Sequence, residues 1–190
     1  MIIGRVLVSF IAIFLWTVEA GASVFAQSVE SFSAVAITPA GPVSNVLLAP
    51  DDFFVDFAGT VGGPGFVTVD FGSWKAIDGP GNDVIVHLFG DWDPPESFFV
   101  DAGDGATFER LGYSGIPDYS KGAIGFGFDL ADVGVSEARL IRIVNEAGGF
   151  DHEGPDINAI ELVNYAPIPE PSTILLLAGS LAFLGVQRRS

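Results

Sequence analysis

The sequence predicts an all-β fold, an antiparallel β-sandwich of the jelly-roll type, flanked by an N-terminal signal helix and a C-terminal hydrophobic helix. Three observations support this prediction. Short β-rich runs with period-two alternation recur along the middle of the chain, and clusters rich in Gly, Pro and Asp separate them. No stretch of this region keeps a helical period for longer than about two turns, although one turn is expected near residues 130–137.

The expected strands are short, as in most sandwiches. Residues 66–71, FVTVDF, show the alternation most clearly, with Val67, Val69 and Phe71 on one face and the intervening residues on the other. The whole set comprises residues 29–37, 53–57, 66–71, 83–88, 98–101, 123–129, 138–144 and 157–163.

The N-terminal segment has the layout of a secretory signal peptide. Arg5 precedes an apolar run over residues 6–18, and small residues follow that suit cleavage after Ala22 or Ala26. Such a run is short for a membrane span, which needs about 20 residues. We expect residues 1–26 to be removed on export and residues 27–166 to form the body; the alternatives are an uncleaved anchor and a buried helix.

The body is strongly acidic and contains no cysteine. Three of the eight Lys and Arg and two of the 24 Asp and Glu lie in the two ends, so residues 27–166 carry five basic and 22 acidic side chains, a net charge of −17. Such a domain repels phosphate backbones and anionic lipid, so we expect no nucleic-acid partner. The absence of cysteine excludes thiol nucleophiles, thiolate metal sites and iron–sulfur clusters.

The chain ends in a segment unlike the body. Pro169-Glu170-Pro171 is followed by an apolar run over residues 174–186 and then by Arg188 and Arg189. The prolines predict a stiff, extended linker. The apolar run is marginal for a membrane span, and the two arginines supply the positive cytoplasmic end. We expect residues 167–190 to form a separate tail rather than a helix of the core.

This ending resembles the PEP-CTERM sorting signal of exported bacterial proteins, in the order and the position of its three parts. The resemblance implies that exosortase, an integral-membrane processing enzyme, recognises Pro169, Glu170 and Pro171. It also implies a Gram-negative bacterium, a transient anchor in the inner membrane through the hydrophobic helix, and sorting to the cell surface or an exopolysaccharide matrix. It implies nothing about what the body does.

The body resembles a group of bacterial surface domains related to the galactose-binding-like, discoidin-type jelly roll. The segments that carry this resemblance are residues 45–57, 66–72, 78–90, 97–112, 128–130 and 156–165. Many such domains hold a structural Ca²⁺ between their terminal strands. The resemblance therefore implies Asp51, Asp156 and Glu161 as candidate ligands.

A second candidate cation site is the glycine-rich segment DGPGND, residues 78–83. Asp78, Asn82 and Asp83 offer the oxygen ligands that Ca²⁺ prefers. The alternative is a loop in which Asp and Asn close turns and glycine allows positive φ.

Aromatic and acidic side chains in loop-like segments offer a candidate sugar site. Asp91, Trp92 and Asp93 lie in one such segment, and Tyr113 and Tyr119 in another. An aromatic face can stack on a pyranose ring while carboxylates accept hydrogen bonds from its hydroxyl groups. The alternative for Trp92 is packing over one end of the core.

The sequence offers little for catalysis. His87 lies in an apolar strand, where a hydrogen-bonded buried histidine is expected, and His152 lies in an acidic loop. Neither a G-x-S-x-G nor an H-E-x-x-H motif is present. We therefore expect a non-catalytic surface or matrix protein that binds polysaccharide and holds a structural Ca²⁺. The alternative is a structural matrix protein without a discrete ligand, and a glycoside hydrolase is the least favoured reading.

Overall fold

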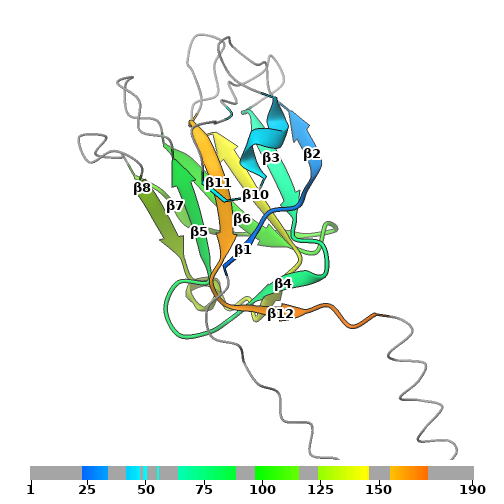
Figure 1. Ribbon diagram of the computed structural model, residues 1–190. Helices are drawn as coiled ribbons and strands as arrows, with labels where there is room; N and C mark the ends of the chain where they lie inside the picture. The colour runs from blue at the N-terminus through cyan, green and yellow to red at the C-terminus, as the bar shows by residue number, and fades with distance from the viewer. Residues whose placement is uncertain are drawn as a thin grey trace, which may run out of the picture.

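The computed structural model describes residues 23–33, 42–47, 49–50, 55, 64–88, 97–115, 124–145 and 155–170. Two antiparallel sheets face each other, as Figure 1 shows, and one hydrophobic core lies between them. The predicted all-β antiparallel sandwich is therefore confirmed. The two flanking helices lie outside the described residues, since the described chain begins at residue 23 and ends at residue 170.

The first sheet has four strands and the second has five. The first sheet has the order β1 (Val24–Phe25), β11 (Ile157–Leu162), β5 (Val84–Leu88) and β8 (Ile124–Phe128). The second sheet has the order β2 (Ser28–Ser33), β3 (Phe66–Asp70), β10 (Leu140–Asn145), β6 (Phe98–Gly103) and β7 (Phe108–Tyr113).

A third, small sheet lies across one end of the sandwich (Figure 1). It consists of β12 (Tyr165–Pro167), β4 (Trp74–Ile77) and β9 (Glu137–Ala138). Two short 3-10 turns complete the described elements: η1 (Val43–Val46) and η3 (Leu130–Val133). The second turn corresponds to the one expected near residues 130–137; it is capped by Asp129 and ends at Gly134, whose φ is 72°.

The core forms because the strands alternate as the sequence pattern predicts. Val84, Val86 and Leu88 point inward from β5, and Ile141 and Ile143 meet them from β10. The largest aromatic group in this layer is a phenylalanine cluster around Phe98, with Phe126 at 5.7 Å and Phe128 at 6.3 Å between ring centroids. Burial of these apolar side chains is the main force that holds the sheets together.

Strand β3 is buried on both faces. Val67, Val69 and Phe71 lie in the core as expected, but Thr68 and Asp70 on the opposite face are only 3% and 4% exposed. A buried carboxylate needs partners, and Asp70 accepts hydrogen bonds from Arg139 Nε at 3.0 Å and from Gly72 N at 2.6 Å. Polar side chains and their hydrogen bonds therefore cover the outer face of β3, which is not open to solvent.

The hairpin between β6 and β7 is closed by an aspartate. The Asp104 carboxylate accepts hydrogen bonds from the backbone N–H groups of Thr107 at 3.0 Å and Ala106 at 2.9 Å. These bonds favour the charged form and lower the pKa of Asp104 from its ordinary value. Gly105, with φ at 100°, supplies the left-handed backbone that the turn requires.

A β-bulge in this hairpin sets which side chains share a face. Arg110 pairs with Asp101 and Gly112 pairs with Val100, so one extra residue, Leu111, is inserted in β7. Arg110 and Tyr113 are three residues apart and would face opposite sides of a regular strand. The bulge places both on the outer face, while Leu111 is buried.

The ends of the body differ from the predicted boundaries. Ala26, expected as the last residue of the signal peptide, is fully buried and donates its N–H to Ile160 O at 3.0 Å. Pro167, expected in the linker, belongs to β12, and Ile168 N donates to Ser73 O at 2.7 Å. The folded body therefore extends beyond residues 27–166 at both ends.

Candidate functional site

The DGPGND segment joins β4 to β5 and is organised by one buried carboxylate. Asp83 Oδ1 accepts hydrogen bonds from Gly79 N at 3.0 Å and Asn164 Nδ2 at 2.7 Å, and its Oδ2 accepts one from Leu130 N at 2.8 Å. Asp83 is fully buried. It thus ties the loop to η3 and to the segment after β11, which is the turn-forming role weighed as the alternative to metal binding.

An acidic cluster nevertheless forms at this loop. One carboxylate oxygen from each of Asp78, Asp83 and Asp129 lies within 4.8 Å of the others. Asp78 and Asp83 were predicted, whereas Asp129 enters from the end of β8. The predicted ligand Asn82 lies instead against Gly127, where its side chain fills the space that a Cβ would occupy.

The other predicted cation ligands are Asp51, Asp156 and Glu161, of which the structure describes the last two. Asp51 lies outside the described residues, although Val55, four residues further on, pairs with Ile157. Asp156 precedes β11 and Glu161 lies within it, and the register of β11 shifts between Ile157 and Ala159. Among the described residues, neither belongs to a group of three acidic or histidine side chains close enough to share a cation.

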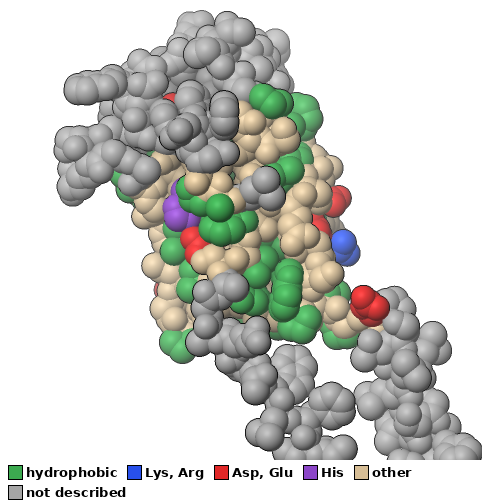
Figure 2. Space-filling model, in the orientation of Figure 1, with side chains coloured by type: hydrophobic (Ala, Val, Ile, Leu, Met, Phe, Trp, Pro, Cys, Tyr) green, Lys and Arg blue, Asp and Glu red, His purple; other side chains and the backbone are tan. Residues whose placement is uncertain are grey.

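Glu161 has partners of its own on the outer face of the four-stranded sheet. Its Oε2 lies 2.7 Å from His87 Nε2, and its Oε1 accepts a hydrogen bond from Ser23 Oγ. Figure 2 shows the histidine next to an acidic side chain on this face, with hydrophobic side chains around them. His87 is therefore hydrogen-bonded as expected, but it is partly exposed rather than buried.

Most of the predicted sugar-binding residues lie outside the described part of the chain. These are Asp91, Trp92, Asp93 and Tyr119. Tyr113 is described: it ends β7, is 45% exposed and lies against Phe99 with ring centroids 5.2 Å apart. Tyr113 is therefore the one predicted sugar-contacting aromatic whose position the structure gives.

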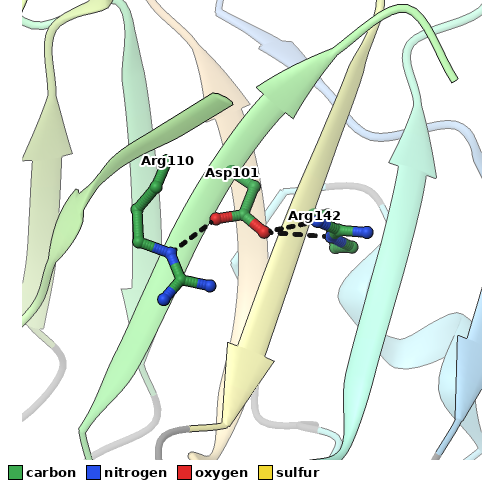
Figure 3. A network of polar contacts seen from close by, with 3 residues as sticks. All are labelled: Asp101, Arg110 and Arg142. Atoms are coloured by element: carbon green, nitrogen blue, oxygen red, sulfur yellow. Dashed lines mark hydrogen bonds and ion pairs between the residues drawn. The ribbon is translucent and has the colours of Figure 1, made fainter. Parts of the chain in front are cut away.

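Next to Tyr113 lies an ion-pair network that the sequence analysis did not anticipate. Asp101, on β6, is only 3% exposed at its side chain and lies between Arg110 on β7 and Arg142 on β10 (Figure 3). Arg110 Nε donates to Oδ1 at 2.9 Å. Arg142 donates to Oδ2 through Nε at 3.0 Å and through a terminal nitrogen at 2.7 Å.

Both guanidinium groups also lie over aromatic rings. Arg110 lies 4.0 Å from the centroid of Phe99, and Arg142 lies 4.1 Å from that of Phe108. Cation–π contacts of this kind contribute roughly 0.5–2 kcal/mol. We call the surface formed by Phe99, Asp101, Phe108, Arg110, Tyr113 and Arg142 the arginine–aromatic face.

The start of the sorting tail is held by the body. Tyr165 packs edge-on against Trp74, with centroids 5.1 Å apart, and β12 pairs with β4. Pro169 and Glu170 follow directly and are exposed, whereas Pro171, Arg188 and Arg189 lie outside the described residues. Within the described residues, no helix has the length and hydrophobicity required to cross a membrane.

Comparison with solved structures shows that other proteins share this sandwich fold. The C-terminal domain of a chitobiase from Bacteroides fragilis has a TM-score of 0.54 and 16% identity, over 75% of this chain and 95% of that one. A truncated AlyQ with CBM32 and alginate lyase domains has a TM-score of 0.50 and 15% identity, over 78% of this chain and 34% of that one.

The same fold also occurs in a structure whose name mentions no carbohydrate. A chain in the structure of reduced XRCC1 bound to the DNA polymerase β catalytic domain matches with a TM-score of 0.52 and 14% identity, over 75% of this chain and 99% of that one. At such identities the likeness shows the fold alone.

The tail is identified from its sequence. Residues 167–189 match the PEP-CTERM protein-sorting motif. The predicted sorting signal at the end of the chain is therefore confirmed. No curated protein matches the sequence.

We predict that Asp101→Asn destabilises the body. The substitution keeps the volume but removes the charge to which both guanidinium groups are paired. The two arginine side chains are 50% and 31% exposed, so they can turn to water when the charge is removed. We therefore expect the free energy of unfolding to fall by about 2–3 kcal/mol, less than the ~3–5 kcal/mol expected when a fully buried pair is broken. Urea denaturation of the parent chain and of the variant measures this difference in the free energy of unfolding.

The matched control is Asp132→Asn, which removes the same charge from an exposed position in η3. It should change the unfolding free energy by no more than about 0.5 kcal/mol. Equal urea midpoints for the two variants would show that the Asp101 ion pairs do not stabilise the fold.

Proposed function

We propose that the protein is exported, sorted through its PEP-CTERM signal to the cell surface or extracellular matrix of a Gram-negative bacterium, and there binds polysaccharide without catalysis. One observation carries the binding proposal: Tyr113 is exposed on the outer face of the sandwich and rests on Phe99. An aromatic ring held from behind presents a flat apolar surface at little entropic cost, as a pyranose ring requires.

The fold supports this proposal, because the B. fragilis domain and the CBM32-containing chain share it and come from proteins named for polysaccharide chemistry. The predicted Trp92, with Asp91, Asp93 and Tyr119, would extend the same kind of surface. These residues enter the proposal from the sequence alone.

The arrangement around Glu161 favours a non-catalytic body. A serine nucleophile is activated when a histidine takes its proton and a carboxylate orients that histidine. Here the carboxylate stands in the middle: Glu161 accepts the hydrogen bond from Ser23 and pairs with His87. His87 is therefore paired with the carboxylate and not with the serine hydroxyl, and we propose no enzymatic activity.

We also propose that the Asp78, Asp83 and Asp129 cluster holds a structural Ca²⁺. Three carboxylates so close together repel one another, and a divalent ion relieves that repulsion. Asp83 already accepts three hydrogen bonds, so Asp78 and Asp129 would supply most of the carboxylate ligation, with backbone carbonyls or water completing the 6–8 oxygens that Ca²⁺ takes.

The specific alternative is a structural matrix protein without a discrete ligand. The net charge of −16 and the acidic cluster favour it, since divalent ions could bridge acidic surfaces of neighbouring molecules.

The glycan proposal predicts that Tyr113→Ala weakens binding on an array of neutral and acidic bacterial polysaccharides. The full-length chain in mild detergent is the test sample. Aromatic stacking contributes roughly 0.5–1.5 kcal/mol beyond area burial, so we expect roughly tenfold weaker binding. Phe32→Ala, which removes another exposed aromatic from the opposite edge of the same sheet, should bind as the parent chain does.

A blank array for the parent chain would contradict the glycan proposal. Self-association that requires Ca²⁺, measured by light scattering on the same sample, would then favour the matrix alternative. Release of sugar from any glycan on the array would overturn the non-catalytic assignment.

The calcium proposal predicts a higher melting temperature in millimolar Ca²⁺ than in EDTA. Ligand that binds only the native state stabilises it by about 2.7 kcal/mol at a hundred times the dissociation constant. Asp78→Asn should lose most of the shift and keep the fold, since the hydrogen bond from Asp78 N to Ser136 O does not involve the side chain. Identical melting curves with Ca²⁺ and with EDTA would disprove the site.

The sorting proposal predicts the mature ends of the secreted protein, which intact mass measures. We expect loss of the tail near Pro169-Glu170-Pro171. Of the two candidate signal-peptide sites, we expect cleavage after Ala22, because cleavage after Ala26 would remove β1 and the buried Ala26 from the sheet. A mature chain that begins at residue 27 would contradict cleavage after Ala22, and one that retains Arg188 and Arg189 would contradict removal of the tail.

A further inference from the structure

We propose that the arginine–aromatic face selects glycans that carry isolated carboxylates among neutral sugars, with the carboxylate on Arg110 and a sugar ring on Tyr113. This inference rests on the proposed polysaccharide binding and adds the substrate class. It starts from the placement of the cations: residues 27–166 contain five Lys and Arg, and Arg110, Arg139 and Arg142 all pair with carboxylates on the five-stranded sheet.

Arg110 is the arginine that shares the Phe99 ring with the exposed Tyr113. It lies on β7, an edge strand of the five-stranded sheet, and its side chain is 50% exposed. Its contact with Asp101 runs through Nε, so its two terminal nitrogens take no part in that ion pair. The planar guanidinium fork is well suited to bidentate recognition of a carboxylate.

The guanidinium is also held in place before any ligand arrives. Phe99 supports it from one side at 4.0 Å, and the Asp101 carboxylate fixes its Nε edge. A group restrained in this way loses less conformational entropy on binding than a solvated lysine does. Asp101 and Phe99 are therefore positioning residues for Arg110.

The sugar platform and the carboxylate-binding group share one ring. Phe99 lies under Arg110 and beside Tyr113, and the bulge at Leu111 brings these two side chains to the same face. A ligand that places a flat sugar face on Tyr113 would thus present its neighbouring substituents towards Arg110. Hydroxyl groups alone would not require a guanidinium there, whereas a carboxylate matches its charge and shape.

The net charge limits how acidic the glycan is. A body of net charge −17 repels a polymer with a carboxylate on every sugar, although ions screen that repulsion beyond about 8 Å at physiological salt. Isolated carboxylates separated by neutral sugars avoid most of this repulsion and still reach Arg110. The same charge disfavours nucleic acid, whose phosphates are closely spaced.

Gellan provides the test, because its repeat carries a single glucuronate among neutral sugars and carboxyl reduction yields a neutral polymer of the same backbone. Affinity electrophoresis of the full-length chain in mild detergent should show about tenfold stronger retardation by gellan than by reduced gellan, as expected for hydrogen bonds to a charged group. Arg110→Gln should remove that difference, and Arg110→Lys should restore only part of it.

Two controls separate loss of binding from loss of fold. Lys75→Gln removes one cation from β4, where it pairs with Glu137, and should keep the preference for gellan. Arg110→Gln should keep the parent melting temperature to within a few degrees, because Arg142 still donates two hydrogen bonds to Asp101.

The outcomes are distinguishable. Equal binding of native and reduced gellan would overturn the carboxylate preference and leave polysaccharide binding standing, whereas binding of neither, together with a blank array, would overturn both. Stronger binding of polygalacturonate than of gellan would contradict the preference for isolated charges. A concentration-dependent dimer that Arg110→Gln abolishes, seen by size-exclusion chromatography, would assign the face to a second copy of the chain and overturn the proposal.

Discussion

A single carboxylate buried on the outer face of a sheet constrains much of this structure. Asp101 is almost inaccessible to water, so it must be paired, and its partners come from the strands on either side of β6. Arg142 on β10 and Arg110 on β7 meet it only in the observed register, since a slip by one residue would turn each side chain to the core. The ion pairs thus favour one alignment of three strands and, at the same time, fix the guanidinium groups over their rings.

Most of the longer strands could be predicted from the sequence, because runs rich in β-branched and aromatic residues stand between clear turn signals. The segments 66–71 and 83–88 alternate between the two faces and appear as β3 and β5, and the segment 157–163 appears as β11. By contrast, β7 reads FERLGY, in which charged residues and the bulge at Leu111 break the period of two. Strand β12 contains a proline, which disfavours a strand, and it forms by pairing with the edge of β4. That pairing depends on the folded position of β4 and cannot be recognised in the local sequence.

The residues of the candidate sites could likewise be predicted only in part from the sequence. Asp78 and Asp83 stand in one glycine-rich loop and could be recognised together, but Asp129 joins them from a strand 46 residues beyond Asp83, which only the fold reveals. Asp101, Arg110 and Arg142 each look unremarkable in the sequence. Their grouping depends on register across three strands and on one inserted residue, so no spacing rule could have found it.

The small sheet at the end of the sandwich has a consequence for how the protein stands relative to a membrane. The chain enters next to the end of β11, where Val24 pairs with Leu162, and leaves through β12, which is at the same end (Figure 1). Tyr113 is in register with Phe99, Val144 and Phe66 at the opposite end. Five residues, 169–173, lie between the bonded Ile168 and the apolar run from residue 174, and the six steps from residue 168 to residue 174 span about 20 Å when extended. A tail held in a bilayer would therefore keep this end of the sandwich within about 20 Å of the membrane and leave Tyr113 at the far end.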